Sequence, residues 1–381
     1  MNSRQLFALF ICLLVPWTMG NGLVPLLPVY ATNLGASPNV VGYYLSFTYL
    51  ILAFGTFFAG WLSDTFQRRK SLLIVFGVPL APTIWLLGSA SNVWQLTIIT
   101  SLAWFLGGIA IALVNILAGL LAEKSKRGRV FGILSVSSGL GALIGGLVTG
   151  PVVDRWDFPT MFAVLAVFSL LLPSAALFLK PESIGRSSSA QVATTSRESM
   201  FEIAFLLLLV ASIAGGIGVF SGRLGTSLAM KELQFSSAAI SSTGAVGGLV
   251  TLPLAPLVGW LSDRLGRVPL LSACYLAGAL GLVGLAASVS LWHFWIVASL
   301  VSILAYVTSG VGSALVTDLV SPNNLGRGMS LFTATIWVGG ISGFAVTGIA
   351  IQRFGIPATF IGAAFLPLFA IVLVYFIRRV R

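Results

Sequence analysis

The chain has 381 residues, of which only 8% are charged, 57% are hydrophobic and 42 are glycine. An ordinary soluble domain has about 25% charged residues, so this composition excludes a typical soluble enzyme; disorder is excluded because disordered chains are poor in apolar residues. The net charge of +11 does not require a nucleic-acid partner, since Lys and Arg also accumulate in the cytoplasmic loops of membrane proteins.

Long apolar segments follow one another along the whole chain. A helix needs about 20 such residues to cross the hydrocarbon core. The segments cover residues 5–33, 38–63, 71–89, 93–122, 130–152, 158–179, 201–229, 236–262, 268–288, 290–317, 328–351 and 355–377. They predict an all-α polytopic protein with twelve transmembrane helices, embedded in a lipid bilayer.

The basic residues predict the orientation of these spans. With the N-terminus in the cytoplasm, 17 of the 21 Lys and Arg residues lie in inner loops or at the termini, and only Arg155, Arg223, Lys231 and Arg353 remain outside. Cytoplasmic loops carry the excess of Lys and Arg. We therefore expect a multi-pass protein of a prokaryotic cell membrane with both termini cytoplasmic.

The two halves of the chain repeat each other. Residues 60–64, Gly-Trp-Leu-Ser-Asp, recur at 259–263, and the Thr-Gly pair at 149–150 recurs at 347–348. A polar stretch at 181–199 separates the halves and is typical of a flexible linker. The sequence predicts a six-helix bundle over 1–180, a cytoplasmic linker over 181–199 and a second bundle over 200–381, a plan in which transporters bind substrate at midplane.

The loop after the second span carries a family resemblance. Its first copy has Gly60, Leu62, Asp64, Arg68 and Arg69, and its second copy has Gly259, Leu261, Asp263, Arg264, Gly266 and Arg267. This pattern resembles the signature loop of the major facilitator superfamily, although the first copy has Gln67 where the family prefers glycine. The resemblance implies a secondary active transporter that works by alternating access and is not an enzyme.

The resemblance also implies a cytoplasmic interlock that holds the inner side closed. Its expected members are Gly60, Asp64, Arg68, Arg69, Glu123, Arg129, Gly259, Asp263, Arg264, Arg267, Asp318 and Arg327. The two glycines would let neighbouring helices approach closely, and the carboxylates would accept bonds from Arg or a helix N-terminus. The alternative is that these charges only set topology and cap helices.

Glycines recur at a spacing of four in the fifth span, ending in Gly146, Gly150 and Pro151. The stretch resembles the Gly-Pro motif of the drug-antiporter branch, but Asp154 and Arg155 replace its trailing glycine pair. Such spacing lets two helix backbones pack closely, and Pro151 is expected to kink the outer end. Ordinary packing and a specific role in exchange remain alternatives.

Polar and aromatic residues within spans are candidates for substrate binding. They are Asn21, Tyr30, Trp104, Asn115, Arg223, Tyr306 and Trp337. The resemblance places the first, fourth, seventh and tenth spans around the cavity, while helix packing or an interfacial belt are the alternatives. Arg223 lies in a glycine-rich stretch able to break the seventh helix, and either reaches the outer interface or binds an anionic substrate group.

Acidic residues are missing from the interior of every predicted span, so proton coupling through a midplane carboxylate is not expected. The single histidine, His293, does not make a metal site, and no cofactor is expected. The favoured function is efflux of apolar or amphipathic small molecules by a functional monomer. A transporter of an anionic metabolite bound by Arg223 is the alternative, and a membrane sensor or intramembrane enzyme is a third. Substrate identity, direction and coupling ion stay open.

Overall fold

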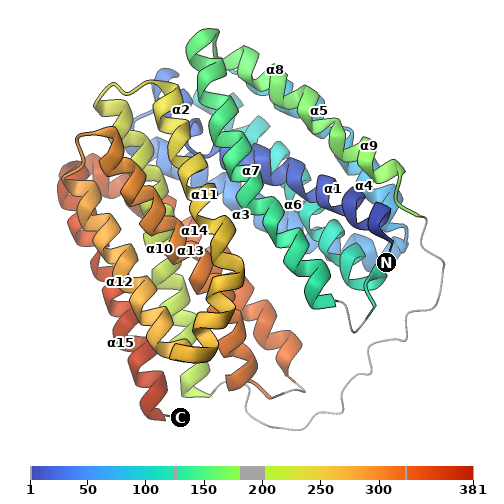
Figure 1. Ribbon diagram of the computed structural model, residues 1–381. Helices are drawn as coiled ribbons and strands as arrows, with labels where there is room; N and C mark the ends of the chain where they lie inside the picture. Colours follow the sequence, from blue (N-terminus) through green and yellow to red (C-terminus); the bar gives the residue numbers. More distant parts are fainter. Residues whose placement is uncertain (1, 124–126, 181–201, 322–323, 381) are drawn as a thin grey trace. The chain divides into compact units, whose positions relative to one another are not determined.

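The computed structural model describes residues 2–123, 127–180, 202–321 and 324–380, and the regular secondary structure in these ranges is helical throughout (Figure 1). The helices are α1 (Ser3–Leu23), α2 (Leu27–Asn33), α3 (Pro38–Phe66), α4 (Arg69–Gly77), α5 (Leu80–Leu87), α6 (Val93–Leu121), α7 (Arg127–Arg155), α8 (Phe158–Ser169), α9 (Leu171–Leu177), α10 (Ile203–Glu232), α11 (Ser237–Leu265), α12 (Arg267–Ala286), α13 (Leu291–Leu319), α14 (Leu325–Ala363) and α15 (Phe365–Val380). The predicted linker at 181–199 lies outside the described residues.

The helices account for the twelve predicted spans. Among the described residues, 11 segments are long and apolar enough to cross a membrane, and the last of them, Leu325–Ile377, has 53 residues. At 1.5 Å per residue this is about 80 Å, far more than one bilayer core. The backbone breaks at Gly355, with φ +75°, so α14 and α15 together form the eleventh and twelfth spans. The predicted all-α, twelve-span architecture is confirmed.

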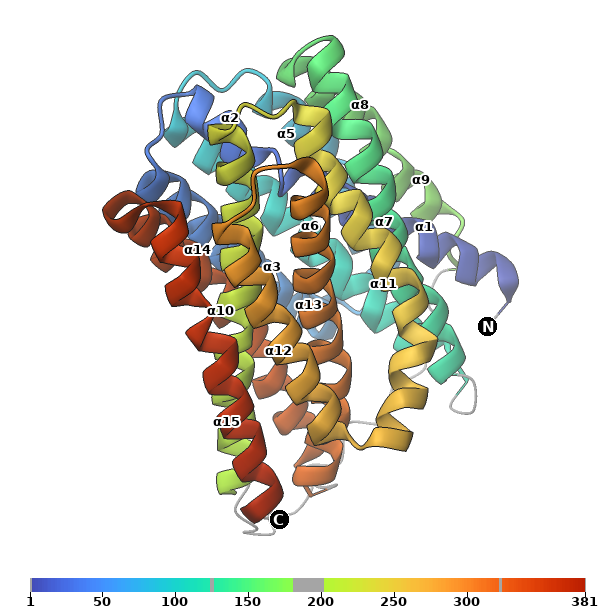
Figure 2. The ribbon, with the colours of Figure 1, turned by 60° about the vertical axis from the view of Figure 1, so that its left-hand side comes forward.

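Contacts divide the chain into two compact units. The first contains Met1–Ile184 and Ser227–Leu252, and the second contains Gly185–Thr226 and Pro253–Arg381. The segment Ser227–Leu252, which the sequence repeat assigns to the second half, thus belongs by contacts to the first. In the first unit α3 packs on α6 and α1 packs on α7, and in the second α12 packs on α13 and α15 (Figure 2).

A glycine-rich helix pair recurs in each half. In the first, a Cβ placed on Gly145 would meet Gly22 Cα of α1 at 2.8 Å, and Thr149 donates a hydrogen bond to the carbonyl of Gly22. In the second, a Cβ on Gly339 would meet Gly216 Cα of α10 at 2.8 Å, and Thr347 of α14 bonds Ser221 of α10 at 2.6 Å. The repeat therefore preserves contacts as well as residues.

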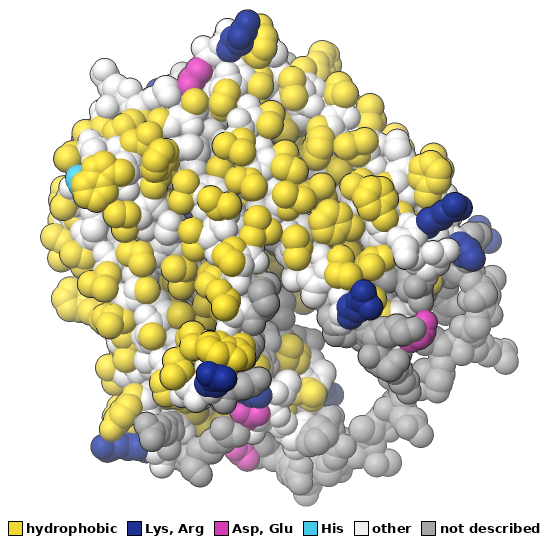
Figure 3. Space-filling view, viewed as in Figure 1, with side chains coloured by type: hydrophobic (Ala, Val, Ile, Leu, Met, Phe, Trp, Pro, Cys, Tyr) yellow, Lys and Arg dark blue, Asp and Glu magenta, His cyan; other side chains and the backbone are white. Residues whose placement is uncertain are grey.

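Apolar side chains cover most of the face drawn in Figure 3, and the Lys, Arg, Asp and Glu side chains seen there lie toward its top, right and lower edges. Large side chains such as Phe57, Trp94 and Phe178 expose more than 60% of their surface. Such exposure is unusual for a soluble protein and fits helices surrounded by lipid.

Equivalent turns have a residue with positive φ in each half. Gly35 and Gln234, 199 residues apart, both have positive φ after a helix, at +85° and +59°. Gln67 and Gly266, also 199 residues apart, have φ +50° and +83° in the two signature loops. Gln67 has ψ 18°, in the left-handed helical region that glycine adopts at lower cost, whereas Gly266 has ψ 156°.

Replacing Gln67 by glycine should stabilise the protein by about 1 kcal/mol, because glycine adopts positive φ without steric cost. Gly266→Gln should destabilise it by about 1–3 kcal/mol, because φ +83°, ψ 156° is tolerated almost only by glycine. Thermal unfolding of the purified variants in detergent measures both. A fall in the midpoint for Gln67→Gly would contradict this account of the turn.

Candidate functional site

Acidic residues lie only at the ends of the described helices. Of the ten in the chain, Glu182 and Glu198 lie outside the described residues, and each of the other eight lies within two residues of a helix end. The described interior of the spans therefore holds no carboxylate, as the sequence predicts. A charged group in the hydrocarbon is costly without a partner, so this placement leaves the spans apolar and aromatic.

The fifth span, α7, presents glycines on two faces. On one face Gly141 and Gly145 lie against α1. On the other, a Cβ on Gly146 would meet the carbonyl oxygen of Ser241 at 2.6 Å, and one on Gly150 would meet Ala238 Cα at 2.6 Å, both on α11. Larger residues would force these backbones apart.

We call the contact of α7 with the first half of α11 the α7–α11 seam. It runs from Gly139 and Gly248 at one end to Gly150 and Ala238 at the other. Ser241 donates a hydrogen bond to the carbonyl of Gly146 at 2.8 Å along it. Pro151 lies inside α7, which continues as helix to Arg155.

Two acids, one at the end of α7 and one in the turn that follows it, cap two different helices. Asp157 is the N-cap of α8 and accepts a hydrogen bond from the backbone N–H of Thr160 at 2.7 Å. Side-chain and backbone hydrogen bonds from Thr160 hold the pKa of the Asp157 carboxyl below its ordinary value. Asp154 instead accepts bonds from the N–H groups of Ser237 and Ala238, both at 2.8 Å, at the start of α11.

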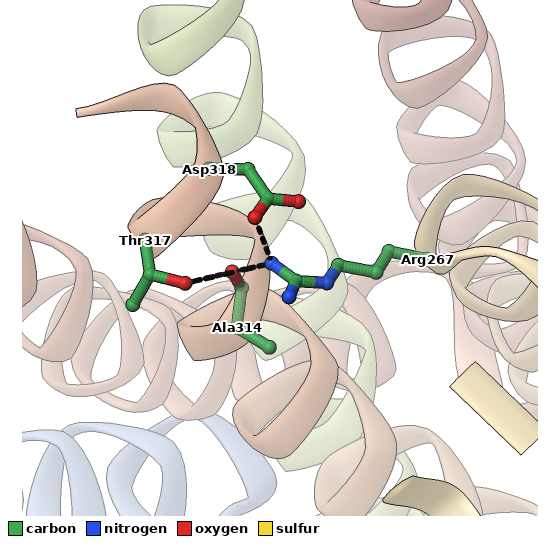
Figure 4. A network of polar contacts seen from close by, with 4 residues as sticks. All are labelled: Arg267, Ala314, Thr317 and Asp318. Carbon is green, nitrogen blue, oxygen red and sulfur yellow. Dashed lines mark hydrogen bonds and ion pairs between the residues drawn. The ribbon is translucent and has the colours of Figure 1, made fainter. Parts of the chain in front are cut away.

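In the second signature loop, Arg267 joins two helices of the second unit. Arg267, the first residue of α12, forms an ion pair with Asp318 of α13 at 2.6 Å (Figure 4). Its guanidinium also donates to the carbonyl of Ala314 and lies 3.5 Å from Thr317 Oγ1. The side chains of Arg267 and Asp318 are each 28% exposed, so water screens the pair only in part.

In the first signature loop, Arg69 donates a hydrogen bond from Nε to the buried Ser63 Oγ at 2.6 Å. Asp64 and Arg68 are exposed. A Cβ on Gly60 would meet no described atom within 4 Å; the close approach expected there occurs one turn earlier, where a Cβ on Gly55 would meet the carbonyl of Phe105 at 2.5 Å.

The other residues expected in the interlock lie on helix ends. Arg264 stacks over Trp260, with 4.2 Å from its guanidinium carbon to the ring centre. Glu123, Arg129 and Arg327 are exposed. Gly259 and Asp263 lie on α11, and their surroundings are outside the described part of the structure.

The candidate substrate residues differ in burial. Tyr30 and Trp104 are each only 7% exposed. Tyr30 donates its hydroxyl to the carbonyls of Leu87 and Ala90, both at 3.3 Å, and stacks on Phe158. Tyr30 thus packs the end of α2 against its neighbours in the first unit. Among the remaining candidates, Asn115 is exposed, and Asn21, Tyr306 and Trp337 are half-buried.

Arg223 lies on an unbroken helix. The expectation that the glycine-rich stretch breaks the seventh span is wrong, because α10 is continuous from Ile203 to Glu232. Its glycines make room for neighbours instead: Gly215 faces the ring of Tyr275, and Gly225 faces the ring of Phe360. Arg223 is half-buried, nine residues or about 14 Å before the end of α10, with its guanidinium 5.5 Å from the ring centre of Phe220.

Sequence reasoning missed the polar partners across helices. Lys70 donates to the carbonyls of Leu177 and Leu179 at the end of α9, at 2.7 and 2.5 Å. Lys231 donates to Asn33 Oδ1 at 2.6 Å. Only the position of each residue near a helix end signals such contacts in the sequence, because the partner is fixed by the fold.

Comparison with known proteins supports one family. A model described as Major Facilitator Superfamily matches residues 8–230 and 206–381. "Multidrug resistance protein MdtG" of Enterobacter lignolyticus is 26% identical over 366 residues, covering 91% of this chain and 85% of that protein.

Two solved structures share the fold. The nucleoside transporter NupG is 14% identical, with a TM-score of 0.77 over 100% of this chain and 99% of that chain. A bacterial homologue of the human lysosomal transporter Spinster is 12% identical, with a TM-score of 0.83 over 99% of this chain and 96% of that chain.

Tyr30→Phe should lower the free energy of unfolding by about 0.5–1.5 kcal/mol, because a buried hydroxyl loses its hydrogen bonds. It should leave the apparent KM for a transported compound unchanged, since the ring stays packed on Phe158. Thermal unfolding and transport kinetics of the same preparation measure the two effects. Trp337→Phe, at a half-buried candidate, is the comparison, and a raised KM for Tyr30→Phe alone would place Tyr30 in the substrate site.

Proposed function

Because the chain belongs to the major facilitator superfamily, whose model matches nearly its whole length, we propose that it exports apolar or amphipathic small molecules by alternating access. It is a secondary transporter rather than an enzyme. Its orientation has both termini in the cytoplasm, which puts the ends of α2 and α7 and the start of α11 on the outer side. It works as a monomer in the cell membrane of a prokaryote.

The composition of the spans is the observation that supports the proposed substrate class. Their described interior lacks carboxylates, and apart from Arg223 its polar candidates are amides and aromatic rings such as Asn115, Tyr306 and Trp337. A cavity of this kind gains binding energy from apolar area and ring stacking, which suits compounds with large apolar surfaces. The relative named as a multidrug resistance protein aligns along most of the chain and supports the same class.

The inner ends of the helices supply the interlock. Asp64 and Asp263 remain the proposed acidic members, with Arg68, Arg69 and Arg267 as their cationic partners. In the structure Arg267 holds α12 to α13 through Asp318. We propose that this ion pair keeps the signature loop of the second half rigid, so that the loop moves as one piece when the inner side opens.

Arg223 supports the second candidate function, transport of an anionic metabolite. It is half-buried about 14 Å from the end of α10, and a cation at that depth is a common partner for an anionic group. The Phe220 ring next to the guanidinium gives Arg223 an alternative, purely structural role. The cation–π contact stabilises the positive charge of Arg223 in the absence of substrate.

One experiment separates the two functions. In proteoliposomes containing the purified chain, export of an amphipathic dye such as ethidium should persist within about twofold in Arg223→Gln, because the dye needs no cationic partner. Uptake of an organic anion such as fluorescein, if the chain carries it, should fall at least about tenfold in that variant, since a charge-assisted bond is lost. Arg353→Gln, at an exposed outer cation, is the matched control.

Absence of protein-dependent movement of the dye would overturn the proposed efflux function. A tenfold loss of dye export in Arg223→Gln, with Arg353→Gln unaffected, would instead assign Arg223 to the site for the dye. Repeating the assay with an imposed pH gradient tests proton coupling, which the described spans would have to achieve without an embedded carboxylate.

A further inference from the structure

The start of α11 receives its cap from another helix. The first N–H groups of a helix have no partner inside it. Ser236, the residue before α11, accepts a hydrogen bond from Ala239 through its hydroxyl at 3.2 Å. The two N–H groups that this local cap does not reach, those of Ser237 and Ala238, donate to the two carboxylate oxygens of Asp154 at the end of α7. All of these residues belong to the first compact unit.

The charge of the carboxylate suits this position. The N-terminus of a helix carries a partial positive charge, and a bidentate carboxylate both satisfies the free donors and balances that charge. Asp154 is exposed, so water can replace both bonds when the helices separate. The contact can therefore form and break without leaving a buried ion.

The hydrogen bonds of Asp154 lie at one end of the α7–α11 seam, along which the two helix backbones are in close contact. At this end a Cβ on Gly150 would meet Ala238 Cα at 2.6 Å, and further along the seam Ser241 donates a hydrogen bond to the carbonyl of Gly146. Lys231 and Asn33 form a second polar bond on the same side, between the end of α10 and the end of α2. Residues of both sequence halves take part in each of these contacts.

The internal repeat shows that the two halves of the chain do not share this cap. The equivalents of Ser237 and Ala238 in the first half are Pro38 and Asn39, and proline has no N–H to donate. The equivalent of Asp154 in the second half is Gln352. One of the two donors and the carboxylate are thus absent at the pseudo-equivalent position, so of these two positions only the one at Asp154 has the cap.

We propose that Asp154 is an outer latch: its carboxylate holds the end of α7 to the start of α11 while the outer side is closed, and releases α11 when the transporter opens outward. The proposal rests on the alternating access and orientation given under the proposed function. It assigns the outer side a polar lock of its own, distinct from the interlock expected at the inner signature loops.

The latch predicts a shift in the conformational equilibrium. Asp154→Asn loses the charge and replaces one of the two acceptor oxygens by an amide donor, so the ratio of outward-open to outward-closed protein should rise about tenfold. Pulsed electron spin resonance can measure this with labels at Ser89→Cys and Val289→Cys, in a chain whose Cys12 and Cys274 are replaced by alanine. The wide-distance population should grow.

Two further variants test whether the effect is specific to the bonds of Asp154. Asp157→Asn removes the neighbouring acid, which caps α8 and not α11, and should leave the distance distribution unchanged. Ser237→Pro keeps Asp154 but removes one of its two donors, as Pro38 does in the first half. Proline is tolerated at the first turn of a helix, so this variant should fold and give an intermediate shift.

An unchanged distribution in both Asp154→Asn and Ser237→Pro, in folded protein, would overturn the latch. An equal shift in Asp157→Asn would do the same, because it would show a general effect of outer charge. The distance measurement needs no substrate, so a shift in protein that fails to move the dye would leave the latch standing and remove only the proposed substrate class.

Discussion

Close contact between helix backbones is the constraint on which this structure depends. Within a bilayer, apolar side chains gain little by leaving lipid for one another, so helices associate through tight packing and polar bonds. Here α7 meets α1 on one face and α11 on the other, with glycines at both contacts. A single helix therefore joins the first span of the chain to the eighth, and any added volume on either face separates them.

The repeat shows which of these contacts belong to the duplicated fold and which are particular to this chain. The packing of α1 on α7 returns as the packing of α10 on α14, down to a Thr hydroxyl that bonds the partner helix in both. The bonds of Asp154 do not return, because Pro38 and Gln352 occupy the matching positions. Departures from symmetry are thus more informative about mechanism than the symmetry itself.

Much of the fold could be predicted from the sequence, because apolar runs and charge clusters are set by the bilayer itself. The twelve spans follow from that rule, and so does the absence of carboxylates within them. The glycines of the fifth span also indicated close packing, but their partner helix could not be read from their spacing.

Predictions about individual residues were less accurate where one type of residue can make several different kinds of contact. Glycines in the seventh span indicated a break, yet they accommodate rings from other helices on a continuous α10. Tyr30 was a candidate for substrate binding, but its hydroxyl bonds backbone carbonyls at the end of α5. Asp154 appeared only as a departure from a motif, because its partners lie more than 80 residues further along the chain.

The left-handed turns have a consequence for how such proteins diverge. Gly35 and Gly266 place glycine at a positive φ, while their counterparts Gln234 and Gln67 stand at positive φ with a side chain. In the second pair only the sign of φ is shared, because ψ is 18° at Gln67 and 156° at Gly266. Each half thus has glycine at one of the two turns, and not at the same one. The left-handed helical conformation at Gln67 tolerates a side chain at some cost, whereas the conformation at Gly266 is tolerated almost only by glycine, so the second signature loop is less free to change this residue than the first.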